Sequence, residues 1–278
     1  MADVVVYVDG FNLYYGSLKR TPYKWLDLGR LCAGMLPNDR VIAIKYYTAR
    51  ISAWPGNPSG PNDQQIYLRA LRTIPNLSIT YGHFLTHSVS MSLTGVTPTK
   101  RVWVDKTEEK GSDVNLASHL VRDAYQKAFE VAVLITNDSD LTEPVRIVRE
   151  ELKLPVGILN PHQHHSAELK RVATFLKRIR QSDLIASQFP AVLNDAKGAF
   201  QVNIPFIIIM QEFKILRSFF DNGLVGQGKL PADPLGDLAL LLAQAVPRFH
   251  HLKLSVPFLA HKQSTVIGCN EFAAAFLS

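Results

Sequence analysis

Short runs of apolar residues alternate with segments of helical periodicity up to about residue 190 of this chain. Near-continuous apolar runs are typical of strands buried on both faces of a parallel sheet, and their alternation with helices is typical of βαβ units. We therefore predict an α/β fold, a Rossmann-like α/β/α sandwich around a mostly parallel sheet. The predicted strands lie at 3–8, 41–47, 77–84, 131–136 and 155–159, and the predicted helices at about 25–36, 62–74, 112–128 and 141–151.

The alternation stops near residue 190. Beyond it, the run from Ile204 to Met210 reads as a strand or the start of a helix, because a membrane-spanning helix needs about 20 apolar residues. Residues 235–246 fit a helix that packs on the main domain or binds a partner. We expect one domain over 1–190 and a C-terminal extension over 191–278 whose role the sequence leaves open.

Composition narrows the class of protein. The chain has 278 residues, 47% of them hydrophobic and 19% charged, which is enough for one substantial globular domain with an appendage. Its two cysteines, Cys32 and Cys269, fit no metal-ligand spacing, so a reducing, cytoplasmic setting is favoured over a disulfide framework. The first apolar run is too short for a signal peptide or a membrane span. The net charge of +6 suits a polyanionic partner but is also common in ordinary enzymes.

Aspartates occur where predicted strands end. Asp9 ends the first run, and Asp138 and Asp140 follow the fourth. Ligands bind beyond the carboxyl ends of parallel strands, so these side chains are expected to meet at one sheet edge. Asp113 opens the third predicted helix, with Ser112 as its N-cap, and the helix dipole would keep it ionised. Crowded carboxylates repel one another unless a cation compensates, so we predict a site for Mg²⁺ or Mn²⁺.

Each of these residues also has a purely structural explanation. Asp113 would be favoured by helix-end electrostatics alone, and an N-cap role explains one aspartate of the pair Asp138 and Asp140. Asn12 follows Asp9 and Gly10 in an ordinary turn sequence, although its amide could also orient a water molecule or a phosphate. A cap does not readily explain both Asp138 and Asp140 beside Asp9, so the metal site is the favoured interpretation.

Three motifs together resemble a known family. VDGFN at 8–12, KGSDVNLA at 110–117 and TNDSDL at 136–141, in this order, are similar to those of the NYN domain family, which has a PIN-like nuclease fold and includes LabA-like bacterial proteins. The resemblance covers roughly residues 3–190. It implies a Mg²⁺- or Mn²⁺-dependent ribonuclease with Asp9, Asp113 and Asp138 as metal-binding acids and Asp140 and Asn12 in support. Many relatives carry a further acid where this chain has His119, which puts a second metal in doubt.

The expected reaction is hydrolysis of RNA, preferably single-stranded, by in-line attack of water that leaves a 5′-phosphate. Asp140 would take the proton of that water or hold a second ion. Residues 86–105 predict either a hairpin arm that passes the site or a solvated hairpin. On such an arm Lys100, Arg101 and the nearby Lys110 would neutralise phosphates, and Trp103, like Tyr14 elsewhere, would stack on a base or simply pack.

Other interpretations of the sequence have less support or stay open. A haloacid dehalogenase phosphatase needs a second aspartate where Phe11 stands, and no GxGxxG follows the first strand to bind a dinucleotide. His162, His164 and His165 fit an exposed loop at the sheet edge better than a zinc site. The basic segment 168–180 is either a nucleic-acid track or a solvated face. A catalytically inactive PIN-like module that binds RNA or a partner protein stays as the alternative, as does a homo-oligomer.

Overall fold

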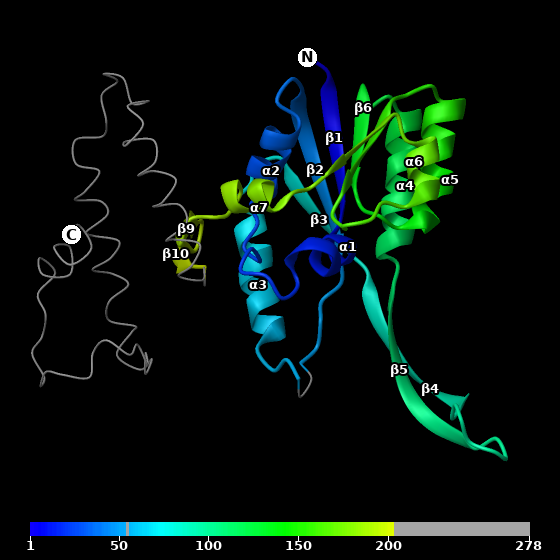
Figure 1. The fold of residues 1–278 in the computed structure, drawn as a ribbon. Helices are drawn as coiled ribbons and strands as arrows, with labels where there is room; N and C mark the ends of the chain where they lie inside the picture. The colour runs from blue at the N-terminus through cyan, green and yellow to red at the C-terminus, as the bar shows by residue number, and fades with distance from the viewer. Residues whose placement is uncertain (54–55, 203–278) are drawn as a thin grey trace, which may run out of the picture. The chain divides into compact units, whose positions relative to one another are not determined.

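The computed structural model describes residues 1–53 and 56–202 (Figure 1). The segments Ile204–Met210 and 235–246, for which the sequence suggested a strand and a helix, lie outside these residues. Among the described residues no helix is both long and apolar enough to cross a membrane. The predicted boundary near residue 190 stays a prediction.

A six-stranded sheet forms the centre of the fold, in the order β3-β2-β1-β6-β7-β8, with every adjacent pair parallel. The predicted α/β class with a mostly parallel sheet is therefore confirmed. All five predicted strands are present, and β8 at one edge was not predicted. The strands are β1 (Asp3–Asp9), β2 (Arg40–Thr48), β3 (Leu77–Tyr81), β6 (Val131–Ile135), β7 (Val156–Asn160) and β8 (Phe175–Arg178).

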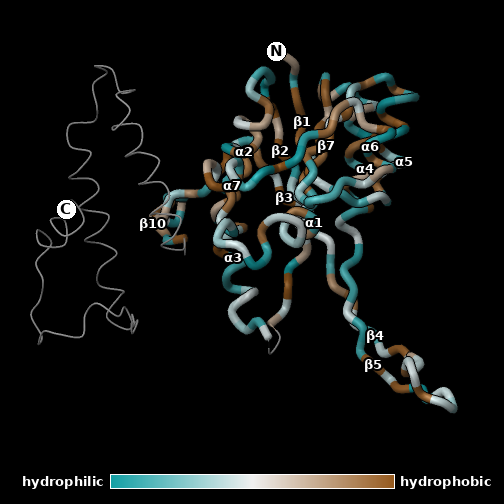
Figure 2. The backbone as a smooth tube through the Cα atoms, viewed as in Figure 1, coloured by the Kyte–Doolittle hydropathy of each residue, from teal (hydrophilic) through white to brown (hydrophobic). Residues whose placement is uncertain are grey.

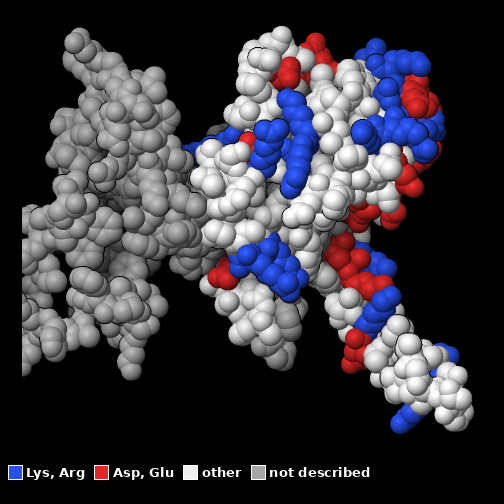
Figure 3. Space-filling model, in the orientation of Figure 1, with Lys and Arg blue, Asp and Glu red and all other residues white. Residues whose placement is uncertain are grey.

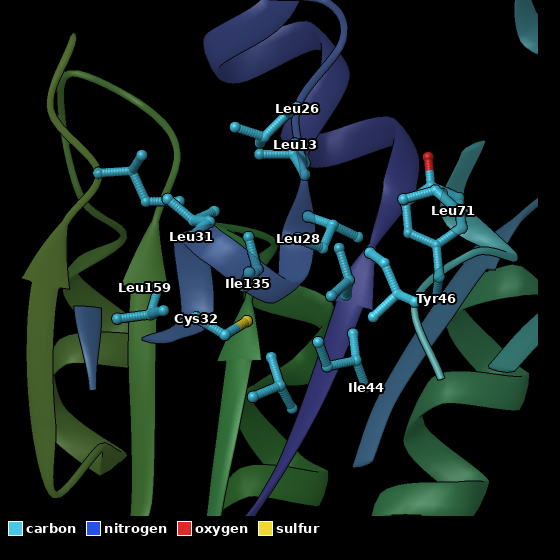
Figure 4. Close-up of a cluster of buried hydrophobic side chains, with 14 of the residues drawn as sticks. Leu13, Leu26, Leu28, Leu31, Cys32, Ile44, Tyr46, Leu71, Ile135 and Leu159 are labelled. Carbon is cyan, nitrogen blue, oxygen red and sulfur yellow. The ribbon is translucent and has the colours of Figure 1, made fainter. Parts of the chain in front are cut away.

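Alternate side chains of β1 enter two separate cores. Val4, Val6 and Val8 pack with α2 (Leu28–Met35), α3 (Gly60–Leu71) and α7 (Gln181–Ala186), as the close-up in Figure 4 shows in part. Val5 and Tyr7 pack on the other face, with α4 (Ser112–Tyr125), α5 (Thr142–Arg146) and α6 (Ala167–Val172). Because both faces are covered, the central strands β1 and β6 are almost entirely apolar, as Figure 2 shows for β1.

The order in which the chain adds strands reverses between β1 and β6, and this place is the reversal point of the sheet. From β1 the chain adds β2 and β3 on one side, then crosses back and adds β6, β7 and β8 on the other. The register pairs Val8 with Ile135, so the next residues, Asp9 and Thr136, lie side by side at the carboxyl ends. Crevices at such reversal points are where open α/β sheets bind ligands.

Two helix starts differ from those expected. Gly10 opens a short helix, α1 (Gly10–Leu13), that continues into the π-helical turn η1 (Tyr14–Leu18), where a simple turn was predicted. The prediction of Ser112 as N-cap of α4 is wrong, because Gly111 takes the cap with a left-handed φ of 95°. Ser112 is instead the first helical residue, and its backbone N–H (3.1 Å) and hydroxyl (2.7 Å) both donate to the carboxylate of Glu109.

Between β3 and α4 the chain forms a two-stranded antiparallel arm, β4 (His83–Ser92) and β5 (Arg101–Lys110), which extends away from the sheet (Figure 1). It confirms the hairpin predicted at 86–105 and is longer. Acidic and basic side chains both lie on it (Figure 3), and Lys106 and Lys110 pair with Glu108.

The other connections are short. After α5 the chain runs through a π-helical turn, η3 (Ile147–Glu151), into β7, and the 3₁₀ turn η2 (Ser139–Leu141) precedes α5. A second hairpin, β9 (Val192–Asp195) with β10 (Gly198–Gln201), follows α7. Arg69 of α3 anchors it, since its guanidinium donates to Asp195 at 2.7 Å and lies 4.0 Å from the Phe200 ring centroid.

Replacing Leu120 by alanine should destabilise the protein by about 2–5 kcal/mol, because Leu120 is fully buried between α4 and the sheet and its loss leaves a cavity. Val114→Ala is the matched control in the same helix, since Val114 is 68% exposed and its replacement should change stability by less than about 0.5 kcal/mol. Urea unfolding followed by circular dichroism measures both. Equal effects of the two changes would contradict the packing of α4.

Candidate active site

Three carboxylates from distant parts of the chain meet at the reversal point of the sheet. Asp9 ends β1, Asp113 lies in the first turn of α4, and Asp138 follows β6. One carboxylate oxygen from each lies within 4.8 Å of the other two. All three side chains line one pocket, whose cavity volume is about 390 Å³. The fold therefore brings together three of the four acids that the sequence proposed as metal ligands.

A shared hydroxyl group sets the positions of Asp9 and Asp138. The Asp9 side chain is almost fully buried; its Oδ1 accepts the Asn12 backbone N–H at 2.9 Å, and its Oδ2 accepts the Thr136 hydroxyl at 3.1 Å. The same Thr136 hydroxyl oxygen accepts the Asp138 backbone N–H at 3.1 Å. Thr136 is itself fully buried, so the ends of β1 and β6 are joined by one rigid contact.

Burial and mutual repulsion raise the pKa values of two of these acids. Burial, with the neighbouring charges of Asp113 and Asp138, raises the pKa of Asp9 to about 7 although two hydrogen bonds oppose the shift. Half-burial, together with the charges of Asp138 and Glu109, also raises the pKa of Asp113. Such a cluster is unfavourable when fully ionised, unless a cation lies between the carboxylates.

The donor set fits a hard divalent cation. All three groups offer carboxylate oxygens, and oxygen is the ligand atom that Mg²⁺ and Mn²⁺ prefer. Asp113 also lies at the amino end of α4, where the helix dipole stabilises its negative charge. The cluster could thus bind a metal ion, and the donor set does not choose between the two metals.

Two further positions considered in the sequence lie apart from the cluster. Asp140 is exposed and does not line the pocket; its backbone N–H donates to Asp138 Oδ1 at 3.0 Å. His119 also lies outside the pocket lining, and its Nδ1 is 3.0 Å from the Tyr47 hydroxyl. His119 of this chain therefore contacts Tyr47 and does not line the pocket with the three carboxylates.

Six pocket residues were not assigned to the site from sequence: Phe11, Tyr15, Phe84, Glu109, Ser112 and His162. The Phe11 ring meets the edge of the Phe84 ring at 5.9 Å between centroids, which ties the root of the arm to α1. Glu109 holds the start of α4 through Ser112. Except for Tyr15, these residues lie within or next to a motif or a strand end, and this position is the sequence feature that could have identified them as site residues. Their residue types alone did not distinguish them from packing residues.

His162 and Asn12 form one contact at the pocket. The Asn12 side-chain oxygen accepts the Asn137 backbone N–H at 2.9 Å and lies 3.1 Å from Nε2 of His162. The loop after β7 thus does lie at the carboxyl edge, as its place in the sequence suggested. The structure brings Asn12 into the same pocket as Asp9 and Asp138.

The suggested nucleic-acid contacts lie on the arm. Lys100 comes just before β5, Arg101 begins β5 and Lys110 ends it, and none of them lines the pocket. The Arg101 guanidinium donates to the carbonyl oxygen of Ser90 at 2.8 Å, and the Lys110 ammonium pairs with Glu108 at 3.3 Å. The Arg101 and Lys110 side chains are therefore partly satisfied within the arm.

Aromatic side chains with a suggested stacking role differ in exposure. Trp103 of β5 is 76% exposed, whereas Tyr14 is partly buried against the core. Its neighbour Tyr15 is 59% exposed and lines the pocket. The Lys19 ammonium lies 4.4 Å from the Tyr15 ring centroid. Tyr15, rather than Tyr14, therefore offers an accessible ring beside the carboxylates.

The chain is similar to a known protein family and to a named protein. A family model described as NYN domain matches residues 3–180. The chain is 29% identical over 225 residues to the protein named 6-hydroxy-3-succinoylpyridine 3-monooxygenase HspA of Pseudomonas putida (strain DSM 28022 / S16), with 69% of this chain and 72% of that protein covered.

Similarity to two solved structures is lower. A protein of unknown function, VPA0982 from Vibrio parahaemolyticus RIMD 2210633, matches with a TM-score of 0.44 and 16% identity, over 68% of this chain and 96% of that one. MurG of Acinetobacter baumannii matches with a TM-score of 0.32 and 14% identity, over 69% of this chain and 44% of that one.

Asp9→Asn should stabilise the metal-free protein at pH 8. The pKa of Asp9 is about 7 in the folded chain and 3.8 without the fold, so between these values the unfolded chain releases a proton that the folded chain keeps, and stability falls as pH rises. The full difference is on the order of 4 kcal/mol. Asparagine has no charge to bury, so its advantage should disappear towards pH 4.

Urea unfolding in EDTA at pH 4.5 and pH 8 measures this effect. Asp140→Asn is the control, because that carboxylate is exposed. If Asp9→Asn lowers the free energy of unfolding at pH 8, burial and charge repulsion do not destabilise the ionised Asp9 carboxylate as described.

Proposed function

The chain belongs to the NYN domain family, which is of nuclease type, and on this premise we propose that it is a metal-dependent ribonuclease. The proposed reaction is hydrolysis of phosphodiester bonds in single-stranded RNA, leaving a 5′-phosphate, in the cytoplasm. The observation that carries the proposal is the group of three carboxylates within 4.8 Å of one another at the reversal point of the sheet.

Asp9, Asp113 and Asp138 would hold Mg²⁺ or Mn²⁺. A bound ion would polarise the phosphodiester group and lower the pKa of a water molecule beside it. Thr136 holds the Asp9 carboxylate and the Asp138 backbone, which keeps the two residues next to each other at the site. Asp140 is assigned a supporting role, since its backbone N–H orients the Asp138 carboxylate.

The aromatic lining of the pocket supports an unpaired substrate. Phe11, Tyr15 and Phe84 line the same cavity as the acids, and every base has a flat face that can stack on such rings. Bases within a duplex are already stacked and paired, so a single strand is the better fit. Lys19, beside the Tyr15 ring, would contact an adjacent phosphate, and Lys110, Arg101 and Lys100 would contact more distant ones along the arm.

The test uses the full chain and end-labelled single-stranded RNA with Mn²⁺, Mg²⁺ or EDTA. We expect wild type to cleave only with metal, and Asp138→Asn to lower kcat by at least about 100-fold, because loss of one charged ligand removes several kcal/mol of transition-state stabilisation. Asp140→Asn keeps the backbone N–H that donates to Asp138, so it should stay close to wild type; a large loss would instead assign Asp140 the role of proton acceptor or ligand of a second ion.

Two outcomes would count against the proposal. Equal cleavage by wild type and the variant with Asp138→Asn would place the activity elsewhere or in a contaminant. RNA binding without metal-dependent products, measured by fluorescence anisotropy, would favour the alternative of a catalytically inactive module that binds RNA or a partner protein.

A second candidate is hydroxylation of a small hydroxypyridine. It is favoured by the ring-lined pocket together with the relative named as a 6-hydroxy-3-succinoylpyridine 3-monooxygenase. Incubation with 6-hydroxy-3-succinoylpyridine, O₂ and a reduced nicotinamide, followed by chromatography, separates the two candidates. Substrate loss that survives Asp138→Asn, with no RNA cleavage by wild type, would favour this second reaction.

A further inference from the structure

We propose that His162 is a positioning residue that acts with the Asn137 backbone N–H to hold the Asn12 amide with its nitrogen toward the substrate, so that Asn12 acts as a hydrogen-bond donor and not as a metal ligand. The inference rests on the proposed phosphodiester hydrolysis and adds two residues to it, His162 and the glycine that admits it, Gly16. No residue pattern in the sequence marked either one for this role.

The orientation of the Asn12 amide follows from its neighbours. A backbone N–H can only donate, so the Asn12 side-chain atom 2.9 Å from the Asn137 nitrogen must be the oxygen. Nε2 of His162 lies 3.1 Å from that same oxygen and must carry a hydrogen to bind it. The two lone pairs of the amide oxygen are then both in use.

This leaves the amide nitrogen of Asn12 free. Among the described residues none accepts a hydrogen bond from it, although Asn12 lines the pocket with Asp9 and Asp138. An oxygen with two donors already on it is a poor ligand for a cation. The nitrogen, in contrast, offers two N–H groups to a non-bridging phosphate oxygen, where negative charge develops during hydrolysis.

Gly16 supplies the space that His162 occupies. A Cβ at position 16 would lie 2.6 Å from Cδ2 and 2.7 Å from Nε2 of the His162 ring, closer than such atoms can approach. Any larger residue would therefore push the ring off Asn12. The position of the His162 ring therefore depends on the absence of a side chain at Gly16, and the contact with Asn12 depends on the position of that ring.

The backbone of His162 is held independently of its ring. Its N–H donates at 2.8 Å to the side-chain oxygen of Asn160, the buried last residue of β7. The Ser17 hydroxyl donates to the carbonyl oxygen of Pro161. Truncation of the ring should therefore remove the contact with Asn12 and leave the loop in place.

A double-mutant cycle on the full chain tests the proposal, with Mn²⁺ and single-stranded RNA. Gly16→Ala and His162→Ala should each lower kcat by about 10-fold with little change in KM, since Asn137 still holds the Asn12 oxygen and only one of its two positioning contacts is lost. Gly16→Ala should cost nothing further in the His162→Ala background, because the ring it displaces is absent. Independent, multiplying losses would overturn the proposal.

A pair of variants separates donor chemistry from bulk. His162→Gln places an N–H₂ group near the position of Nε2 and should restore most of the activity. His162→Glu has nearly the same shape as His162→Gln, but its carboxylate cannot donate a hydrogen bond to the Asn12 oxygen, so it should not restore activity. Equal activity of these two variants would overturn the role assigned to the Nε2 hydrogen.

A structural readout does not depend on catalysis. Nitrogen-15 NMR should show a hydrogen on Nε2 of His162 in wild type, with a signal that shifts in the variants with Gly16→Ala and Asn12→Ala. An Nε2 that carries no hydrogen in wild type would overturn the proposal. If wild type shows the Nε2 hydrogen but cleaves no RNA, the proposed ribonuclease activity fails while the contact between His162 and Asn12 stands.

Discussion

The hydrogen bonds that hold the Asp9 carboxylate inside the protein are the constraint on which the rest of the site depends. Burial alone would favour its neutral form, and the charges of Asp113 and Asp138 add to this. The N–H of Asn12 and the hydroxyl of Thr136 nevertheless fix both carboxylate oxygens. The fold therefore holds in place a charge that it does not itself neutralise, and this is the condition under which a cation binds strongly.

Topology explains why three distant segments reach this point. The strand order reverses between β1 and β6, so their carboxyl ends border an open crevice, and α4 begins at its rim. The long connection between β3 and α4 contains the arm, whose root enters the pocket through Phe84 and Glu109. The root of the arm therefore lies beside the carboxylates.

The sequence predicted the acids better than their surroundings. Asp9 and Asp138 could be found because parallel strands that end in an acid bring those acids to one edge, and Asp113 because it begins an amphipathic helix. The contacts of Thr136 and His162 could not be found, since they depend on the register between β1 and β6 and on the course of the loop after β7.

The errors have equally local causes. Ser112 has the chemistry of an N-cap, but Gly111 adopts the left-handed conformation and takes that place. Strand β8 was missed because its charged, half-exposed residues at the sheet edge lack an apolar run. The most direct test of the account is Mn²⁺ binding to the full chain, measured by electron paramagnetic resonance in competition with Mg²⁺. The account predicts saturable binding that is lost when Asp9, Asp113 and Asp138 are all replaced by asparagine; unchanged binding by that triple variant would contradict it.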